Sequence, residues 1–170
     1  TSGSKDIINA PYLHVTDNAV MNSHILRSVY ENKVSHFLFM SCTVMYKNSR
    51  KYLSEKDVNE NKIFPNYYGV AQTKLYIEKI CKFYSNISKT KFTIIRHSNI
   101  YGYNDKFDID KGHFIGSAIK KIYSLKHPYI KVFGSGKEKR DFLFIDDLIN
   151  FIEKSIKNQR RQYDYQRLFY

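Results

Sequence analysis

Two short, continuous runs of apolar residues constrain the fold of this chain more than any other feature. Residues 36–41 (His-Phe-Leu-Phe-Met-Ser) and 92–96 (Phe-Thr-Ile-Ile-Arg) are rich in aromatic and β-branched side chains. A parallel strand that is covered on both faces has this unbroken apolar pattern, because neither of its faces meets water. Stretches with helical periodicity separate these runs, so the sequence predicts an α/β domain with a mainly parallel sheet.

The helical stretches are marked by apolar residues about four positions apart. Met21, Ile25 and Val29 predict a helix that Asn32 and Lys33 end. A final helix is expected to be capped by an aspartate, as carboxylates accept hydrogen bonds from the first-turn amides. The predicted elements are helices at about 17–31, 70–85 and 115–122 and after Asp146 or Asp147, strands at 36–41, 92–96, 130–133 and 142–145, and a polar surface loop at 47–66.

The length and composition are typical of one domain of a soluble protein. The chain has 170 residues, of which 42% are hydrophobic, enough for one core. No run of about 18 apolar residues is present, and the first residues lack a signal-peptide pattern. Cys42 and Cys81 lack metal-ligand spacing and favour structural thiols in a reducing compartment. We therefore expect a cytoplasmic location and no membrane partner.

The formal net charge of +12 raises the question of nucleic-acid binding. Lysines are spread over most polar stretches and are interleaved with acidic residues, and only 137–140 and 159–161 are densely basic. This pattern favours solvated faces, with a basic groove for a small anionic ligand as the alternative. No nucleic-acid recognition motif is present, so we expect no nucleic-acid partner.

Two motifs suggest a family. Residues 66–74 (Asn-Tyr-Tyr-Gly-Val-Ala-Gln-Thr-Lys) and 96–102 (Arg-His-Ser-Asn-Ile-Tyr-Gly) resemble the active-site half of the extended short-chain dehydrogenase/reductases, the NAD-dependent epimerase/dehydratase family. The resemblance implies a partial Rossmann-like, doubly wound sheet. It makes 1–105 the C-terminal half of the NAD(P)-binding domain, 106–157 part of the substrate-binding region with a returning strand and helix, and 158–170 a non-matching tail. The family's Gly-x-x-Gly-x-x-Gly turn is missing from the sequence, so we expect a piece of a longer enzyme.

In this family a tyrosine and a lysine four residues apart share one helix face, where the ammonium stabilises the phenolate and binds the cofactor ribose. Tyr68 and Lys74 are the candidates, but they are six residues apart. The residue four after Tyr68 is Gln72, and the residue four before Lys74 is Val70. Three interpretations stay open: Tyr68 precedes the helix and its phenol turns back to Lys74, Tyr68 works through another proton path, or the site is degraded.

In this family, the hydroxyl of a serine or threonine also orients the substrate carbonyl. This residue lies at the end of the strand that precedes the helix. Counting back four residues from Tyr46 reaches Cys42, whose thiol is a weak donor. The resemblance therefore assigns the role to Ser41 or Thr43, which flank it.

Downstream residues narrow the resemblance to the GDP-L-fucose synthases. His113 matches the acid/base of C3/C5 epimerisation, and Arg140 matches the arginine that binds the nucleotide pyrophosphate. From the residues alone, an exposed cap or packing residue is the more common role for a histidine such as His113, and a solvated charge cluster is the more common setting for Arg140. The resemblance further implies cofactor contacts by Gly3, Lys74, Arg96, Ser98 and Asn99, and substrate contacts by Asn99, His113 and Arg140.

These matches imply an NAD(P)-dependent nucleotide-sugar epimerase/reductase that makes GDP-L-fucose from GDP-4-keto-6-deoxymannose, or a fragment of one. NADP is favoured over NAD by the resemblance, a homodimer is expected, and another nucleotide-sugar epimerase or dehydratase is the near alternative. A non-catalytic remnant that binds a sugar nucleotide or a partner subunit is the alternative from a different class.

Overall fold

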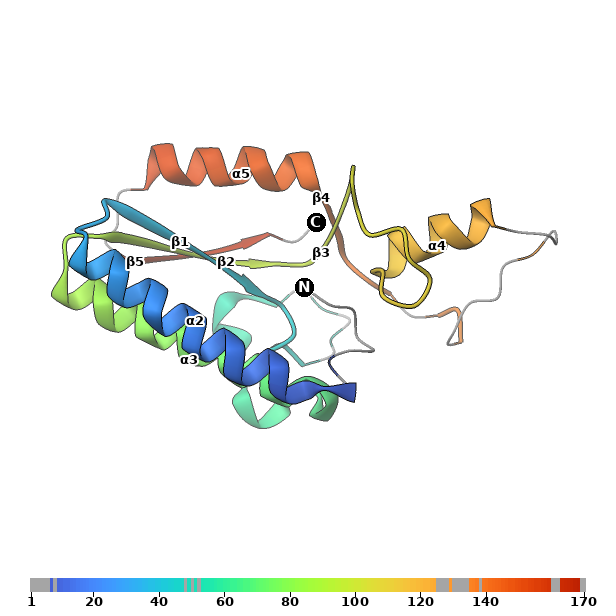
Figure 1. The fold of residues 1–170 in the computed structure, drawn as a ribbon, viewed down its shortest axis with the longest axis horizontal. Coiled ribbons are helices and arrows are strands. Elements are labelled where there is room, and N and C mark those ends of the chain that lie inside the picture. Colours follow the sequence, from blue (N-terminus) through green and yellow to red (C-terminus); the bar gives the residue numbers. More distant parts are fainter. Residues whose placement is uncertain are drawn as a thin grey trace.

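The computed structural model describes residues 7, 9–47, 49, 51, 53–124, 129, 135–137, 139–159 and 163–168, the last range by its backbone. Figure 1 shows a parallel sheet with α2 and α3 on one face and α5 on the other. A smaller lobe containing α4 extends from the end of this sheet. The predicted α/β fold with a parallel sheet is confirmed.

The main sheet has the strand order β1-β2-β5, and a two-stranded sheet pairs β3 with β4 in parallel. His36 lies opposite Lys91 where β1 and β2 begin, and Cys42 lies opposite His97 where they end. The elements are α2 (Pro11–Glu31), β1 (His36–Cys42), three 3-10 turns η1 (Glu55–Asp57), η2 (Glu60–Lys62) and η3 (Pro65–Tyr67), α3 (Tyr68–Ile87), β2 (Lys91–His97), β3 (Asn99–Tyr101), α4 (Phe114–Tyr123), β4 (Phe142–Phe144), α5 (Ile145–Asn158) and β5 (Tyr163–Leu168).

The end of the chain contributes to the sheet. Residues 158–170 were expected to lie outside the family pattern, but Tyr163–Leu168 pairs in parallel with β2 along its length. Phe92 lies opposite Tyr163 and His97 opposite Leu168. Much of this segment is therefore a strand of the domain rather than a tail.

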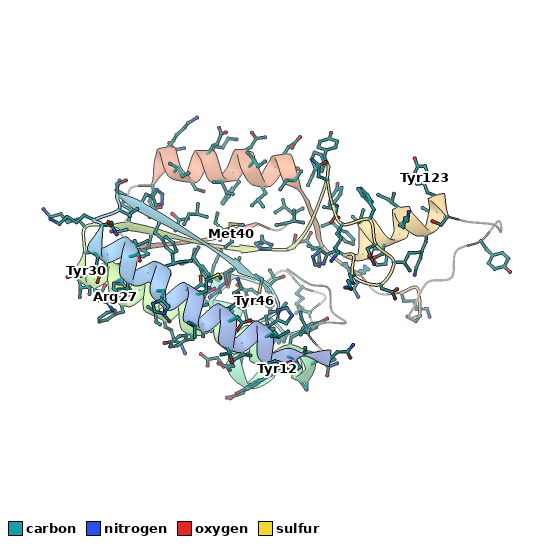
Figure 2. The ribbon with its side chains drawn as sticks, viewed as in Figure 1. Tyr12, Arg27, Tyr30, Met40, Tyr46 and Tyr123 are labelled. Carbon is teal, nitrogen blue, oxygen red and sulfur yellow. The ribbon has the colours of Figure 1, made fainter. Side chains whose placement is uncertain are left out.

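Two apolar layers fill the space on either side of the sheet. Phe92 and Ile94 pack with buried side chains of α2 and α3, whereas Ile95, the next residue of β2, packs against α5. Figure 2 shows the same division, with Met40 on the α5 side of the sheet and Tyr46 on the other. The alternation follows from the two-residue repeat of a strand.

The buried stripe of α2 differs from the predicted one. Met21 is 52% exposed and Ile25 is 39% exposed, while Asn22 and Leu26 are buried instead. Val29 is buried as predicted, so the buried stripe is formed by Asn22, Leu26 and Val29. The amide of Asn22 donates to the carbonyl of Asn18 at 2.8 Å, which satisfies this polar group in the core. Periodicity alone does not reveal such a bond.

The segment 47–66 is the turn-rich surface loop that the sequence predicts, since most of its described residues are exposed. The turns η1 and η2 lie within it, and η3 begins at its end. Ile63 is buried against Met45 and Leu75, and this contact anchors the loop to α3.

The start of α5 also corrects a prediction. Phe144 is the N-cap, and Asp146 and Asp147 lie inside the first helical turn without capping it. Their carboxylates still stabilise the helix at this position, because the N-terminal end of a helix carries partial positive charge. The strand expected at 130–133 lies outside the described residues.

A buried ion pair joins α3 to β2 and, through Ser41, to β1. Arg96 and Glu78 are 5% and 1% exposed, and two hydrogen bonds of 2.6 and 3.1 Å link them. Glu78 also accepts a 2.5 Å bond from the hydroxyl of Ser41, and Arg96 donates to the Tyr46 hydroxyl at 2.8 Å and the Glu55 carbonyl at 3.1 Å. Burial alone lowers the pKa of Arg96, but the bonds and charge of Glu78 outweigh it and raise that pKa.

A second polar cluster ties the start of the strands to the end of α5. Nε2 of His36 lies 2.9 Å from the Thr93 hydroxyl, which in turn donates to the side-chain oxygen of Gln159. The amide of Gln159 donates to the Phe92 carbonyl at 2.8 Å. Burial lowers the pKa of His36, and the positive charge of Lys91 adds to this effect.

We predict that Glu78→Gln lowers the free energy of unfolding by about 3–5 kcal/mol, because it leaves the buried Arg96 guanidinium without a counter-charge. Chemical denaturation measures this loss. Lys79→Met, which breaks the exposed Lys79–Glu60 pair, is the control and should cost less than about 1 kcal/mol. Equal effects of the two variants would contradict the interpretation.

We predict that His36 makes the fold less stable in acid. Its folded pKa lies below the ordinary 6.5, so the folded state binds fewer protons than the unfolded state. The stabilisation is complete above pH 6.5 and is lost as the pH falls towards the lowered pKa. His36→Asn should flatten the dependence of the melting temperature on pH, whereas His24→Asn, at an exposed position of α2, should leave it unchanged.

Candidate functional site

Lys74 is held at the carboxyl end of β1. Its ammonium donates to the Met40 carbonyl at 2.8 Å and lies 4.8 Å from the centre of the Phe39 ring. Glu78, one helical turn further along α3, binds the neighbouring residue Ser41. An ammonium has three donors, so the bond to Met40 leaves Lys74 with two for a ligand.

Tyr68 does not precede the helix, which corrects the first interpretation of the spacing. Its backbone is already helical (φ −54°, ψ −51°), because the turn Pro65–Tyr67 leads directly into α3. Six residues along a helix place Tyr68 and Lys74 on different faces. The Tyr68 ring is 54% exposed, while Lys74 points at the sheet, and no contact between the two is recorded among the described residues.

Of the two candidate hydroxyls, only that of Thr43 is unengaged among the described residues. Ser41 is fully buried and donates its proton to Glu78, so we reassign it from the carbonyl to the structural network. Thr43 lies just beyond β1 and is half-buried. Between them, the half-buried thiol of Cys42 has a raised pKa, because desolvation disfavours the thiolate, so it stays protonated near neutral pH.

The residues expected to bind the cofactor divide into two groups. Arg96 uses its guanidinium within the network with Glu78, so we reassign it to a structural role. Ser98 follows β2 directly, is 5% exposed, and its hydroxyl has no partner among the described residues. A buried hydroxyl of this kind is ready to bind a ligand atom. Gly3 lies outside the described residues.

His97 joins this group without having been singled out from the sequence. Its Nδ1 lies 2.8 Å from the Ser98 carbonyl, which can only accept, so Nδ1 carries the proton and Nε2 is the free acceptor. Burial lowers the pKa of His97, and the charge of Lys74 lowers it further. The imidazole is therefore neutral near neutral pH. It lies within the Arg-His-Ser-Asn motif already noted, which was the available signal.

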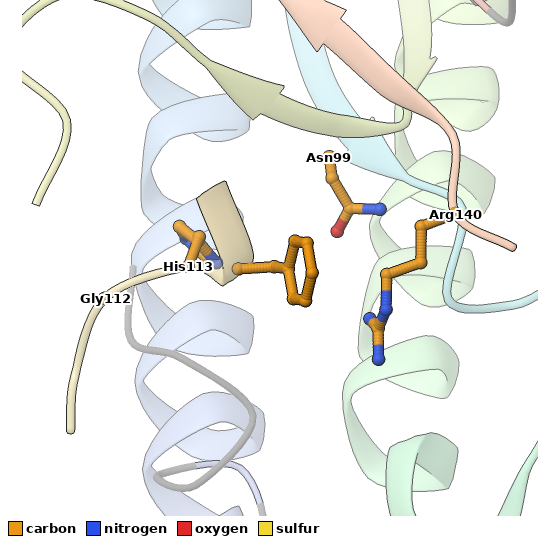
Figure 3. Close-up of a pocket in the computed structure, with 5 residues that line it drawn as sticks. Asn99, Gly112, His113 and Arg140 are labelled. Carbon is orange, nitrogen blue, oxygen red and sulfur yellow. The ribbon is translucent and has the colours of Figure 1, made fainter. Parts of the chain in front are cut away.

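Three predicted substrate residues meet in one pocket of about 200 Å³. Asn99 comes from β3, His113 from the start of α4, and Arg140 from the segment before β4 (Figure 3). The Asn99 amide donates to the Asp141 carbonyl at 3.0 Å, which ties the two sides of the pocket together. Gly112 and Phe114 complete the lining. The sequence separation of 41 residues between Asn99 and Arg140 is bridged by the parallel pairing of β3 with β4.

Arg140 and His113 are free to act on a ligand. Neither side chain makes a hydrogen bond or ion pair with the described residues, and both are exposed. His113 is the N-cap of α4 without a capping bond from its side chain, so the imidazole is not the helix cap considered from the sequence. The first-turn amides of α4 lack intrahelical partners and carry partial positive charge, which suits an anion.

The loop before His113 is closely packed. A Cβ atom on Gly112 would overlap the carbonyl oxygens of Lys106 and Asp108, so this position requires glycine. The Ser117 hydroxyl donates to the Asp108 carbonyl at 2.7 Å and fixes the same loop to α4. Phe114 was not singled out from the sequence, although it follows His113 directly.

Two classes of site are not formed by the described residues. No group of three or more His, Cys, Asp or Glu side chains in that part of the chain is placed to hold a metal ion. None of the helices in the described ranges is long and apolar enough to cross a membrane.

The chain is similar to curated enzymes of nucleotide-sugar metabolism. It is 27% identical over 156 residues to a GDP-L-colitose synthase of Yersinia pseudotuberculosis, covering 89% of this chain and 51% of that protein. It is 24% identical over 138 residues to a GDP-L-fucose synthase of Escherichia coli K12, covering 79% and 43%. The chain thus spans about half the length of the curated relatives it matches.

A solved structure and a family model agree with this similarity. The structure of a GDP-L-fucose synthetase from Naegleria fowleri bound to NADP superposes with a TM-score of 0.85 at 22% identity, covering 96% of this chain and 54% of that one. The likeness shows a shared Rossmann-like fold. The model of the NAD dependent epimerase/dehydratase family matches residues 1–167, and the chain therefore belongs to that family.

Proposed function

We propose that this chain is the part of an NAD(P)-dependent nucleotide-sugar epimerase/reductase that carries most of its catalytic and substrate-binding side chains, acting on a GDP-4-keto-6-deoxy sugar. The observation that carries the proposal is the pocket in which Asn99, His113 and Arg140 meet. In this proposal, residues 1–105 belong to the cofactor domain and 106–157 begin the substrate region. The names of the relatives, GDP-L-fucose and GDP-L-colitose synthases, support this substrate class.

The residues at the carboxyl ends of the strands fit a nicotinamide cofactor, with NADP favoured because the similar Naegleria fowleri structure has it bound. Ligands of open α/β sheets bind at this end. Lys74 has two donors left for ribose hydroxyls, and Ser98 has a buried hydroxyl without a partner among the described residues. When bound, the reduced nicotinamide would supply a hydride to the C4 carbonyl of the sugar.

The protein side chains would then handle protons and charge. His113 removes and returns protons at C3 and C5, beside the carbonyl that acidifies them. Thr43 orients the C4 oxygen by a hydrogen bond, and Tyr68 donates a proton to that oxygen as it gains negative charge. Arg140 binds two oxygens of the diphosphate with its planar donors.

We also propose that the enzyme is a homodimer that uses the outer face of α2 and α3. Large apolar side chains are exposed along both helices, and they are at positions where a monomer normally has polar residues. They include Leu13, Val20 and Met21 on α2 and Tyr76, Phe83 and Ile87 on α3. A cytoplasmic location stays a prediction.

A non-catalytic remnant that binds a sugar nucleotide is the second candidate. The separation of Tyr68 from Lys74 favours it, because an isolated phenol has no cation to stabilise its phenolate. The two functions differ in whether hydride is transferred.

The decisive experiment mixes the full-length protein that contains this chain with NADPH and GDP-4-keto-6-deoxymannose and follows the loss of NADPH absorbance and the product by NMR. Formation of GDP-L-fucose would establish the reductase. Binding of GDP without loss of NADPH would establish the remnant, and absence of both would contradict the proposed substrate class.

We predict that Tyr68→Phe lowers kcat for reduction by at least about 10²-fold, as expected for loss of a general acid. Tyr67→Phe, one residue earlier, is the matched control and should retain activity. Gln72→Lys should raise the rate, because residue 72 lies four positions after Tyr68 and shares its helix face. A Tyr68→Phe variant with an unchanged or higher kcat would contradict this role.

We predict that His113→Asn stops the exchange of the C3 and C5 hydrogens with deuterated solvent, because asparagine cannot carry the proton. NMR of the recovered 4-keto sugar measures this exchange directly. His24→Asn, on the outer part of α2, is the control and should exchange like the parent protein. Unchanged exchange in His113→Asn would exclude the histidine as the acid/base.

A further inference from the structure

We propose that Phe114 is a positioning residue for anion binding: its ring orders the Arg140 guanidinium while leaving the N–H donors of that group free for the oxygens of a nucleoside diphosphate. The inference rests on the proposed function, since it assumes that Arg140 meets a phosphate. It adds a residue that the motif resemblance did not assign.

The geometry of the pocket supports this role. The Arg140 Cζ lies 5.8 Å from the centre of the Phe114 ring, within the range of a cation–π interaction. Phe114 is 50% exposed and lines the pocket beside Asn99 and His113. The ring is itself fixed, because it stacks on Phe142 of β4 at 5.9 Å with an interplanar angle of 27°.

The two arginines near the site show how partner chemistry sets their roles. Arg96 directs its donors to Glu78, the Tyr46 hydroxyl and the Glu55 carbonyl, and is buried with them. Arg140 is exposed and makes no hydrogen bond with the described residues. Its recorded partner is an aromatic ring, which attracts a cation without accepting its N–H bonds.

This difference matters for binding. A guanidinium recognises phosphate through parallel N–H donors in its own plane, and a ring beside it leaves these donors available. Arg140 stands in the segment before β4, outside any helix or strand, so its side chain would otherwise lose considerable rotamer freedom on binding. The Phe114 ring removes part of that loss before the ligand arrives.

The test measures the affinity for GDP by isothermal titration calorimetry, with inorganic pyrophosphate and guanosine as the separate halves of the ligand. Phe114→Leu should weaken GDP and pyrophosphate binding by about two- to fivefold, the effect of an exposed cation–π contact. Guanosine binding should not change. Phe114→Tyr keeps the ring and should restore the parent affinity.

Two controls separate positioning from direct contact and from misfolding. Tyr123→Leu removes an 87% exposed ring at the other end of α4 and should not change affinity. In an Arg140→Met background, Phe114→Leu should have no further effect on GDP affinity, because its contribution passes through the arginine. Equal melting temperatures would confirm that each variant is folded.

The outcomes distinguish the two proposals. If Arg140→Met weakens GDP binding and Phe114→Leu does not, the role of Phe114 is overturned and the proposed function stands. A loss that persists in the Arg140→Met background would show that Phe114 contacts the ligand itself, which also overturns positioning. No binding of GDP or pyrophosphate by the parent protein would overturn both proposals.

Discussion

The geometry of this domain depends on one buried ion pair, Arg96 with Glu78. It connects β2 to α3 directly, to β1 through Ser41, and to the loop after β1 through Tyr46 and Glu55. Desolvation of both charges offsets much of their attraction, so the pair need not make the fold more stable than an apolar replacement would. Its contribution is to geometry: each Arg96 N–H group forms its hydrogen bond only when strand, helix and loop are arranged in one way.

That arrangement determines what lies at the carboxyl ends of the strands. Glu78 fixes α3 so that Lys74, one turn earlier, meets the Met40 carbonyl and keeps two donors for a ligand. The end of β2 then presents Ser98 and leads through Asn99 into β3, whose pairing with β4 brings Arg140 into the same pocket as His113 (Figure 3). Residues 96–99 therefore connect the proposed cofactor end of the sheet directly to the substrate pocket.

The sequence allowed β1, β2 and β4 to be predicted, because a run such as 92–96 is apolar on both faces. The strands β3 and β5 were not predicted, since neither has such a run. The α2 face was predicted only in part: Val29 is buried as expected, but Asn22 and Leu26 are buried in place of Met21 and Ile25. A hydrophobic pattern does not reveal an asparagine whose amide is satisfied inside the core. Asn99, His113 and Arg140, which the motif resemblance named as substrate residues, line one pocket, and their contact with a substrate stays a prediction. The resemblance could not show that Ser41 and Arg96 both donate hydrogen bonds to Glu78, because a motif gives residue types and not their partners.

The same ion pair limits how Tyr68 can act. A rotation of α3 that carried Tyr68 towards the side chain of Lys74 would also move Glu78, and it would leave Arg96 without a counter-charge in the core. The helix therefore cannot adapt to the six-residue spacing at low cost. If Tyr68 donates a proton, the resulting phenolate must regain a proton from the substrate, from solvent or from a group other than Lys74.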